Sequence, residues 1–167
     1  IILNRADTKN AITCKMRDEL NEILEMAIID TNISRISLSA NGRIFSTGGA
    51  VQEFGLVTDP ASAHWIRSIS LPAKKLIQLQ DKLCVNINGG AVGAAIEMAA
   101  FSKKIVASQN SWFQLPELKY GLIPGAGGTV SIPRRIGRQK TAYMAITAKK
   151  VSAKKALEWG LIDAIEH

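Results

Sequence analysis

A single carboxylate, Glu97, stands in an otherwise uncharged segment, GGAVGAAIEMAAF at residues 89–101. An unpaired charge is costly to bury, so this side chain lies either exposed on a helix edge or inside a pocket. If 91–101 is helical, the residues three and four positions from Glu97 are glycine, alanine or phenylalanine. An apolar pocket would raise the pKa of the carboxyl group, which suits a general acid or base. The segment alone leaves both interpretations open.

The same segment is rich in small residues, which let a ligand approach the backbone closely. If a helix begins near Gly93, its first N–H groups have no partner inside the helix and can bind an anion or a developing oxyanion. Tight packing of a helix on a strand requires small residues equally well. The turn FSTGGA at 45–50 also exposes its backbone, so one N–H group from each turn could hold a single carbonyl oxygen.

A second carboxylate, Glu117, follows Pro116 in the segment LPELKYGLIPGAGGT. Proline followed by an acidic residue is typical of a helix start, so local sequence favours a capping role for this carboxylate. Other chemistries lack candidates, because His64 and His167 stand in no metal-ligand pattern and no G-x-S-x-G elbow occurs. The GAGG run matches neither a P-loop nor a dinucleotide fingerprint. Paired carboxylates with backbone donors remain.

The elements that must position these groups alternate between helices and strands. Amphipathic spacing predicts the helices and apolar runs predict the strands. Ser152 is expected to cap the last helix and Gly160 to end it. The interleaved order indicates one α/β domain over residues 1–167. The predicted helices cover 11–30, two pieces of 59–80 divided at Pro72, 138–148 and 152–159, and the predicted strands cover 34–40, 82–88 and 103–108.

Composition narrows the class of protein. The 167 residues are 47% hydrophobic, which suits a folded domain with a core. No uncharged apolar run is long enough to span a bilayer, and no signal peptide is visible. Cys14 and Cys84 suggest neither a disulfide framework nor a zinc site, so a reducing compartment is expected. The net charge of +7 arises mainly after residue 90, and it fits either a solvated helical surface or an anionic partner.

Several long segments resemble the crotonase (enoyl-CoA hydratase/isomerase) superfamily, and together they span essentially the whole chain. The resemblance implies a spiral of repeated ββα units over the single domain 1–167, apparently without the first strand and the C-terminal helices of the family. It also implies acyl-CoA substrates and assembly as a homotrimer or homohexamer. The segments are LNRADTKNAI, NGRIFSTGGAVQEF, VNINGGAVGAAIEMAAFSKKIVAS, FQLPELKYGLIPGAGGTVSIPRRIGRQKTAYMAI and SAKKALEWGLIDAI.

The resemblance also assigns roles to particular residues. The N–H groups of Gly49 and Ala94 would form an oxyanion hole for the thioester oxygen. Glu97 would help to activate water for attack at the β-carbon, and Glu117 would manage proton delivery at the α-carbon. Two positions depart from the common pattern, since glycine is frequent at Ala94 and aspartate at the end of the glycine turn. The turn residues expected to line the substrate site are Ala50, Val51 and Gln52.

The leading hypothesis is hydration of a trans-2-enoyl-CoA to a 3-hydroxyacyl-CoA in fatty acid metabolism. It needs no metal or other cofactor, since CoA belongs to the substrate. Double-bond isomerisation within the same family is the alternative. A non-catalytic RNA-binding module is an alternative of another class, but the first helix is acidic and no aromatic stacking motif accompanies the basic residues. The expected location is the cytoplasm, or the mitochondrial matrix in a eukaryote, with no membrane partner.

Overall fold

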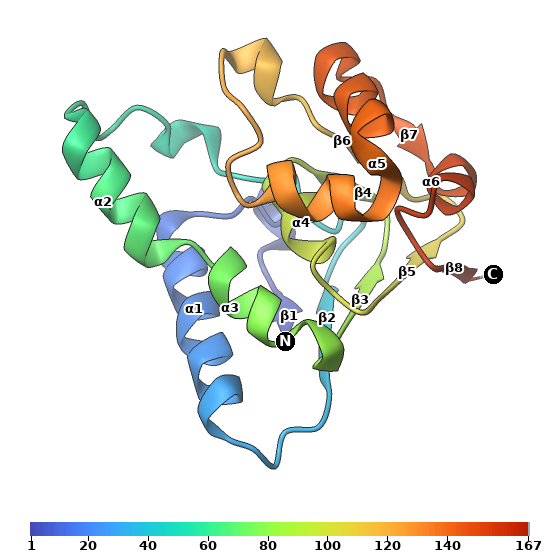
Figure 1. The fold of residues 1–167 in the computed structure, drawn as a ribbon, viewed down its shortest axis with the longest axis horizontal. Helices are drawn as coiled ribbons and strands as arrows, with labels where there is room; N and C mark the ends of the chain where they lie inside the picture. The colour runs from blue at the N-terminus through green and yellow to red at the C-terminus, as the bar shows by residue number, and fades with distance from the viewer. Residues whose placement is uncertain (167) are drawn as a thin grey trace.

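A five-stranded parallel sheet forms the larger β layer of the molecule (Figure 1). The computed structural model describes residues 1–166, apart from the side chain of Arg67. Neighbouring strands are held in register, with Ile36 opposite Leu83 and Val85 opposite Ile105. In spatial order the strands are β1 (Ile2–Leu3), β2 (Ile36–Ala40), β3 (Leu83–Ile87), β5 (Lys104–Ser108) and β8 (Ala164–Glu166).

A second, smaller β layer follows the first at the carboxyl ends of its strands. Parallel bridges join Ile12 to Gly49 and Ser46 to Ala91, and so extend this layer beyond its named strands. The chain passes from a strand of the first sheet to a short piece of the second layer and then to a helix, and repeats this path. This repetition is the expected spiral of ββα units. The named strands of the second layer are β4 (Gly90–Val92), β6 (Trp112–Gln114) and β7 (Val151–Ser152).

Local capping explains where several helices begin. The Thr13 hydroxyl accepts a hydrogen bond from the N–H of Met16, and Ser152 caps the last helix as predicted. Gly160 ends that helix in the left-handed conformation. The α-helices are α1 (Cys14–Ile29), α2 (Pro60–Ser70), α3 (Ala73–Gln78), α4 (Ala94–Ala99), α5 (Gly128–Thr147) and α6 (Ala153–Trp159). The 3-10 helices are η1 (Ala6–Thr8), η2 (Val51–Glu53), η3 (Gln80–Lys82) and η4 (Glu117–Tyr120).

Two predicted helices differ from the structure. The helix considered over 91–101 forms only over Ala94–Ala99 (α4), because β4 occupies residues 90–92 and pairs with β6. Pairing across the layer therefore overrides the helical preference of the alanines. The helix expected near 138–148 is only the second half of α5, which begins ten residues earlier and is interrupted at Gly137 (φ 78°, ψ 164°). The other predicted helices and strands are confirmed within a few residues at each end.

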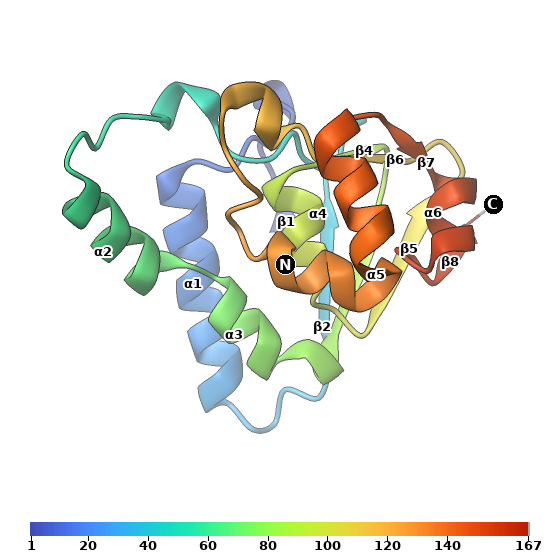
Figure 2. The same cartoon turned by 45° about the horizontal axis from the view of Figure 1, so that its top comes forward.

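One face of the five-stranded sheet packs on helices and the other does not. Along β3, Leu83, Val85 and Ile87 are buried, whereas Cys84 is half-buried and Asn86 is exposed. The buried face joins a core that includes residues of α1, α3, α4 and α5. Figures 1 and 2 show these helices on the near side of the sheet. Among residues 1–166, no helix is both long enough and apolar enough to cross a bilayer.

Candidate active site

Glu97 lies on α4 with only 1% of its surface exposed, so the helix-edge interpretation of this residue is wrong. Its Oε2 atom accepts hydrogen bonds of 2.7 Å from the backbone N–H groups of Ala126 and Gly128. Gly128 is the first residue of α5, so its N–H group has no acceptor inside that helix. The start of α5 therefore stabilises one oxygen of a carboxyl group that is otherwise enclosed.

The backbone around Glu97 is held as firmly as its side chain. The hydroxyl of Ser131 on α5 donates to the carbonyl oxygen of Glu97 at 2.6 Å. The N–H group of Glu97 donates to the carbonyl oxygen of Gly93 at 3.0 Å. A β-carbon at Gly128 would overlap the Glu97 side chain. Position 128 therefore needs glycine so that the carboxyl group can reach the start of α5.

Glu117 begins η4 directly after Pro116, at the position that the sequence predicted for a helix start. Its Oε2 atom is buried and has no hydrogen-bond partner among the described residues. Its Oε1 atom lies where a β-carbon of Gly93 would stand, and Gly93 itself has a positive φ of 52°. Glycine at 93 therefore makes room for the carboxyl group next to the start of α4, and one oxygen remains available to a small polar molecule.

Burial shifts the proton affinity of both acids. Burial raises the pKa of Glu97 to about 7; the neighbouring Glu117 adds to this, while the N–H groups of Gly128 and Ala126 oppose it. Burial also raises the pKa of Glu117. Two interacting acids lose their protons in two steps that belong to the pair. Both acids therefore hold a proton more readily than a carboxyl group in water, which suits a general acid or base near neutral pH.

The turn that carries Gly49 is fixed by a parallel bridge to Ile12. The N–H group of Ile12 donates to the carbonyl oxygen of Gly48 at 2.8 Å, and the N–H group of Ala50 donates to the carbonyl oxygen of Ile12 at 2.9 Å. In such a bridge the opposite residue, Gly49, directs its own N–H group away from Ile12. That N–H group donates no hydrogen bond to another described residue.

The same turn lies against the start of α4. A β-carbon at Gly48 would be 2.5 Å from the carbonyl oxygen of Val92 and 3.4 Å from the backbone nitrogen of Ala94. Gly48 also has a φ of 82°, so both its shape and its conformation favour glycine. Ala94 is the first residue of α4, and its N–H group likewise donates to no described residue. The two predicted donors therefore stand on adjacent segments, each with a free N–H group.

Ser46 supports this turn and was not identified from the sequence. It is fully buried, its hydroxyl donates to the carbonyl oxygen of Asn10 at 2.8 Å, and the same hydroxyl accepts from the N–H group of Gly48 at 3.0 Å. The Asn10 side chain in turn donates to the carbonyl oxygens of Asn41 and Ile44. A serine two residues before a glycine in a tight turn is the only sequence signal for this network.

The three predicted substrate-binding residues differ in what they can offer. Ala50 is buried and its N–H group is occupied by Ile12, whereas Val51 and Gln52 are exposed on η2. Glu53 fixes this short helix to α1, because its Oε2 atom accepts a 2.6 Å hydrogen bond from the N–H group of Cys14. The accessible part of the turn is therefore formed by Val51 and Gln52.

Three further residues form hydrogen bonds with Glu97 and were not identified from the sequence: Ala126, Gly128 and Ser131. The available signal was the glycine-rich run GAGG, which is typical of a backbone that approaches another group closely. A cavity of about 260 Å³ borders Gly128 and runs along α5 past Thr129. A larger depression, of about 500 Å³, lies at the opposite edge of the five-stranded sheet and contains none of these residues.

The sequence is similar to those of known hydratases and isomerases. Residues 1–166 match the family model described as enoyl-CoA hydratase/isomerase. The chain is 30% identical to the 2,3-dehydroadipyl-CoA hydratase of Escherichia coli, over 99% of this chain and 64% of that protein. It is 27% identical to the trans-2-decenoyl-[acyl-carrier-protein] isomerase of Streptococcus mutans, over 97% of this chain and 63% of that protein.

Solved structures agree with the sequence comparison. The enoyl-CoA hydratase of Thermoplasma volcanium superposes with a TM-score of 0.89 at 28% identity, covering 99% of this chain and 66% of that one. The chain thus spans less than two thirds of the first of these relatives, and nearly all of it takes part in the match. With the ββα spiral in common and a family model that matches 166 residues, the chain belongs to the enoyl-CoA hydratase/isomerase family.

Proposed function

We propose that the protein hydrates a trans-2-enoyl-CoA to a 3-hydroxyacyl-CoA. The observation that carries this proposal is the position of two carboxyl groups, Glu97 and Glu117, around Gly93, with raised pKa values. The free N–H groups of Gly49 and Ala94 lie on the neighbouring segments. One acid, one base and two donors are the groups that addition of water to a conjugated thioester requires.

The two N–H groups would hold the thioester oxygen and stabilise the negative charge that develops on it. This polarisation makes the β-carbon electrophilic. Water then bonds to the β-carbon through its oxygen while it loses a proton to the ionised carboxylate. The α-carbon receives a proton from the protonated acid, so the elements of one water molecule are added across the double bond.

The roles of the two acids are those that the family resemblance implies, and the contacts of each acid are compatible with them. Oε2 of Glu97 accepts hydrogen bonds from two N–H groups at the start of α5, which partly oppose the effect of burial on its pKa and leave Oε1 to accept a proton from water. Glu117 has a buried oxygen with no partner, as expected for a group that exchanges a proton with water or substrate. We therefore assign activation of water to Glu97 and protonation of the α-carbon to Glu117.

The remaining expectations belong to the same proposal. The substrate is an acyl-CoA, with Val51 and Gln52 as the accessible residues of the turn beside the donors. We also propose assembly as a homotrimer or homohexamer and a role in fatty acid metabolism, as the family resemblance implies. The proposed mechanism uses no metal or further cofactor.

Mass spectrometry of the intact chain incubated with crotonyl-CoA tests the proposal directly. Hydration adds one water to the substrate and produces 3-hydroxybutyryl-CoA. Migration of the double bond leaves the mass unchanged, so its product is identified by chromatography against but-3-enoyl-CoA. A shifted double bond without hydrated product would replace hydratase by isomerase activity. Recovery of unchanged crotonyl-CoA would contradict both.

A further inference from the structure

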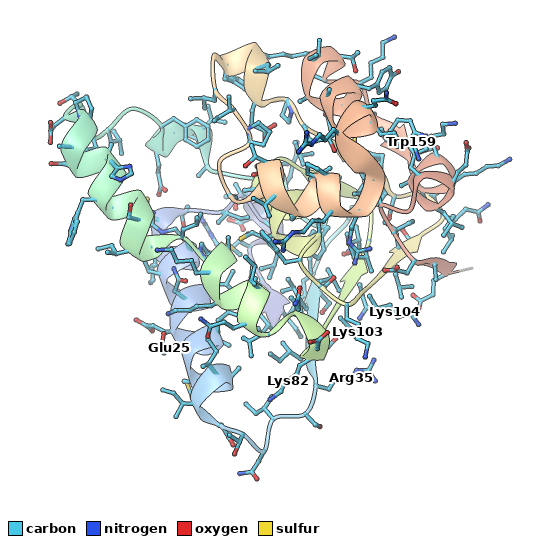
Figure 3. All side chains as sticks on the ribbon, viewed as in Figure 1. Glu25, Arg35, Lys82, Lys103, Lys104 and Trp159 are labelled. Atoms are coloured by element: carbon cyan, nitrogen blue, oxygen red, sulfur yellow. The ribbon has the colours of Figure 1, made fainter. Side chains whose placement is uncertain are left out.

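Four cationic side chains gather around the depression of about 500 Å³ at the amino ends of the long strands. Arg35 precedes β2, Lys82 precedes β3, and Lys103 and Lys104 stand at the start of β5. Figure 3 labels all four at the lower end of the sheet, although they come from three separate parts of the chain. The fold has therefore collected these charges, since in sequence the first and last are almost 70 positions apart.

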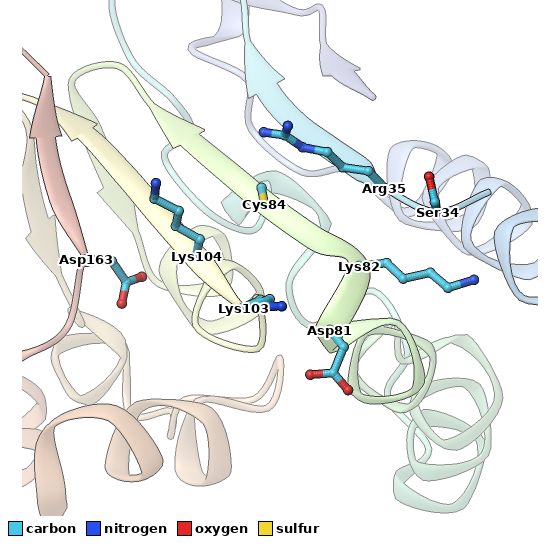
Figure 4. A pocket seen from close by; sticks show the side chains of 8 residues that line it. All are labelled: Ser34, Arg35, Asp81, Lys82, Cys84, Lys103, Lys104 and Asp163. Atoms are coloured by element: carbon cyan, nitrogen blue, oxygen red, sulfur yellow. The ribbon is translucent and has the colours of Figure 1, made fainter.

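Strand register places two of these cations on the same open face of the sheet. Cys84 lies opposite both Ser37 and Lys104, so these side chains form one row across three strands. Arg35 is two positions before Ser37, and residues two apart in a strand point to the same face. Figure 4 shows the Arg35 and Lys104 side chains on either side of Cys84. This is the sheet face that the helices leave uncovered.

The acidic residues of the depression neutralise it only in part. Asp163 is already occupied, because one of its oxygens accepts hydrogen bonds from Arg135 at 3.1 Å and from the N–H group of Ile105 at 2.7 Å. Asp81 is the other carboxylate at the depression. Across residues 1–166, none of the four cations has a salt bridge or a side-chain hydrogen bond.

Exposed lysines are commonly solvated without a partner, so the charge alone would carry no conclusion. Here Arg35 and Lys104 lie on either side of Cys84 at one concave surface (Figure 4), and an anion bound between them would reduce the repulsion of their like charges. Arginine binds phosphate oxygens through its planar fork, and lysine supplies a point charge. A compact anion with several negative charges can therefore bind the arginine and the lysines together.

We propose that this depression binds a small oligophosphate, with a diphosphate group as its recognised part. A volume of about 500 Å³ suits a ligand the size of pyrophosphate or a nucleotide, whereas a nucleic-acid strand requires an extended basic track. The depression is separate from the candidate active site. It lies at the amino ends of the strands and the carboxyl groups lie beyond their carboxyl ends, and a five-residue strand alone spans about 16 Å.

Isothermal titration calorimetry of the 167-residue chain with pyrophosphate and with ADP tests this site. We expect saturable binding of one ligand for each chain at low salt, weakened at least about tenfold by the double substitution Arg35→Gln/Lys104→Gln. The matched control is Arg134→Gln/Lys149→Gln, which removes the same charge from two exposed residues outside the depression. The control should retain affinity within about twofold, because only general attraction is reduced.

Comparing the two ligands shows which part of the ligand the site recognises. Equal binding of pyrophosphate and ADP indicates recognition of the diphosphate alone, and tighter binding of ADP indicates a nucleotide; both support the proposal. Equal weakening in the two double variants, or no saturation at about 10 mM ligand, would overturn it. Competition between CoA and pyrophosphate is expected at the depression itself, because CoA also carries a diphosphate group. Tighter binding of a short RNA would indicate nucleic acid and would overturn the proposal.

Discussion

Charged side chains are buried at one edge of the five-stranded sheet and exposed at the other. Beyond the carboxyl edge, Glu97 is buried, bound by two backbone N–H groups, and has its pKa raised to about 7. At the amino edge, Arg35, Lys103 and Lys104 are exposed and have no carboxylate partner among the described residues. The same sheet thus carries an acidic pair with one fully enclosed member, Glu97, at one edge and an open basic group at the other.

The difference shows that burial determines whether a charged side chain can transfer protons or only attract ions of opposite charge. Enclosure makes ionisation of a carboxyl group costly, so its proton affinity moves toward neutral pH and proton transfer becomes accessible. Exposure leaves cations in contact with water and screened by salt, so they act only on ligands that bring several negative charges. The following four experiments test that contrast.

The largest effect is expected from removing the two acids of the candidate active site. Glu97→Gln and Glu117→Gln should each lower kcat for hydration of crotonyl-CoA by about 10²–10⁴-fold, because an amide cannot accept or deliver the proton. Glu158→Gln is the control, since this glutamate is exposed and pairs with Lys155. Steady-state kinetics measures the effect. A near-normal rate in either variant would remove that residue from the mechanism.

The glycine that makes room for Glu117 should be the next most sensitive position. Gly93→Ala should lower kcat by about 10²-fold, because the added β-carbon displaces the carboxyl group. Gly55→Ala is the matched control, since Gly55 also has a positive φ (76°) but open space around it. Both variants should lose similar stability in urea unfolding. Equal losses of activity would show that backbone strain alone explains the result.

Glu97 should also make stability fall as pH rises. Its pKa is about 7 in the folded protein against an ordinary value of 4.5, so the folded chain binds more protons between these values. The free energy of unfolding should therefore decrease from pH 5 to pH 8 by about 2–3 kcal/mol, and Glu117 should contribute in the same direction. Glu97→Gln should remove most of this slope in urea unfolding at the two pH values. A slope that Glu97→Gln leaves unchanged would contradict the buried acid as its source.

The exposed cations should give the smallest effect, and one that salt abolishes. Arg35→Gln/Lys104→Gln should raise the free energy of unfolding by a few tenths of a kcal/mol at low salt, because like charges no longer repel. At about 0.5 M salt the gain should vanish, whereas the pH dependence due to Glu97 should persist, since enclosed charges are screened much less. Chemical unfolding at two salt concentrations measures both. A gain that salt does not change would contradict an electrostatic origin.

Local sequence predicted most of the elements because their signals are short in range. The helix over 11–30, the break at Pro72 and the capped helix after Ser152 depend on residues within one or two turns, and the structure contains all three. Strand β4 could not be predicted, since Gly90, Ala91 and Val92 pair only because β6 lies beside them. The early start of α5 was missed because proline and glycine lie within its length.

The sequence by itself determined the inventory of chemistry: two acids in apolar or glycine-rich surroundings, two small-residue turns, and the segments that carry the family likeness. Only the tertiary structure decided that Glu97 is buried and meets the N–H groups of Ala126 and Gly128, some thirty residues away. It also collected Arg35 and Lys104 at one depression. The physical reason is that burial and convergence depend on neighbours in adjacent turns of the spiral, and such neighbours leave no periodic trace along the chain.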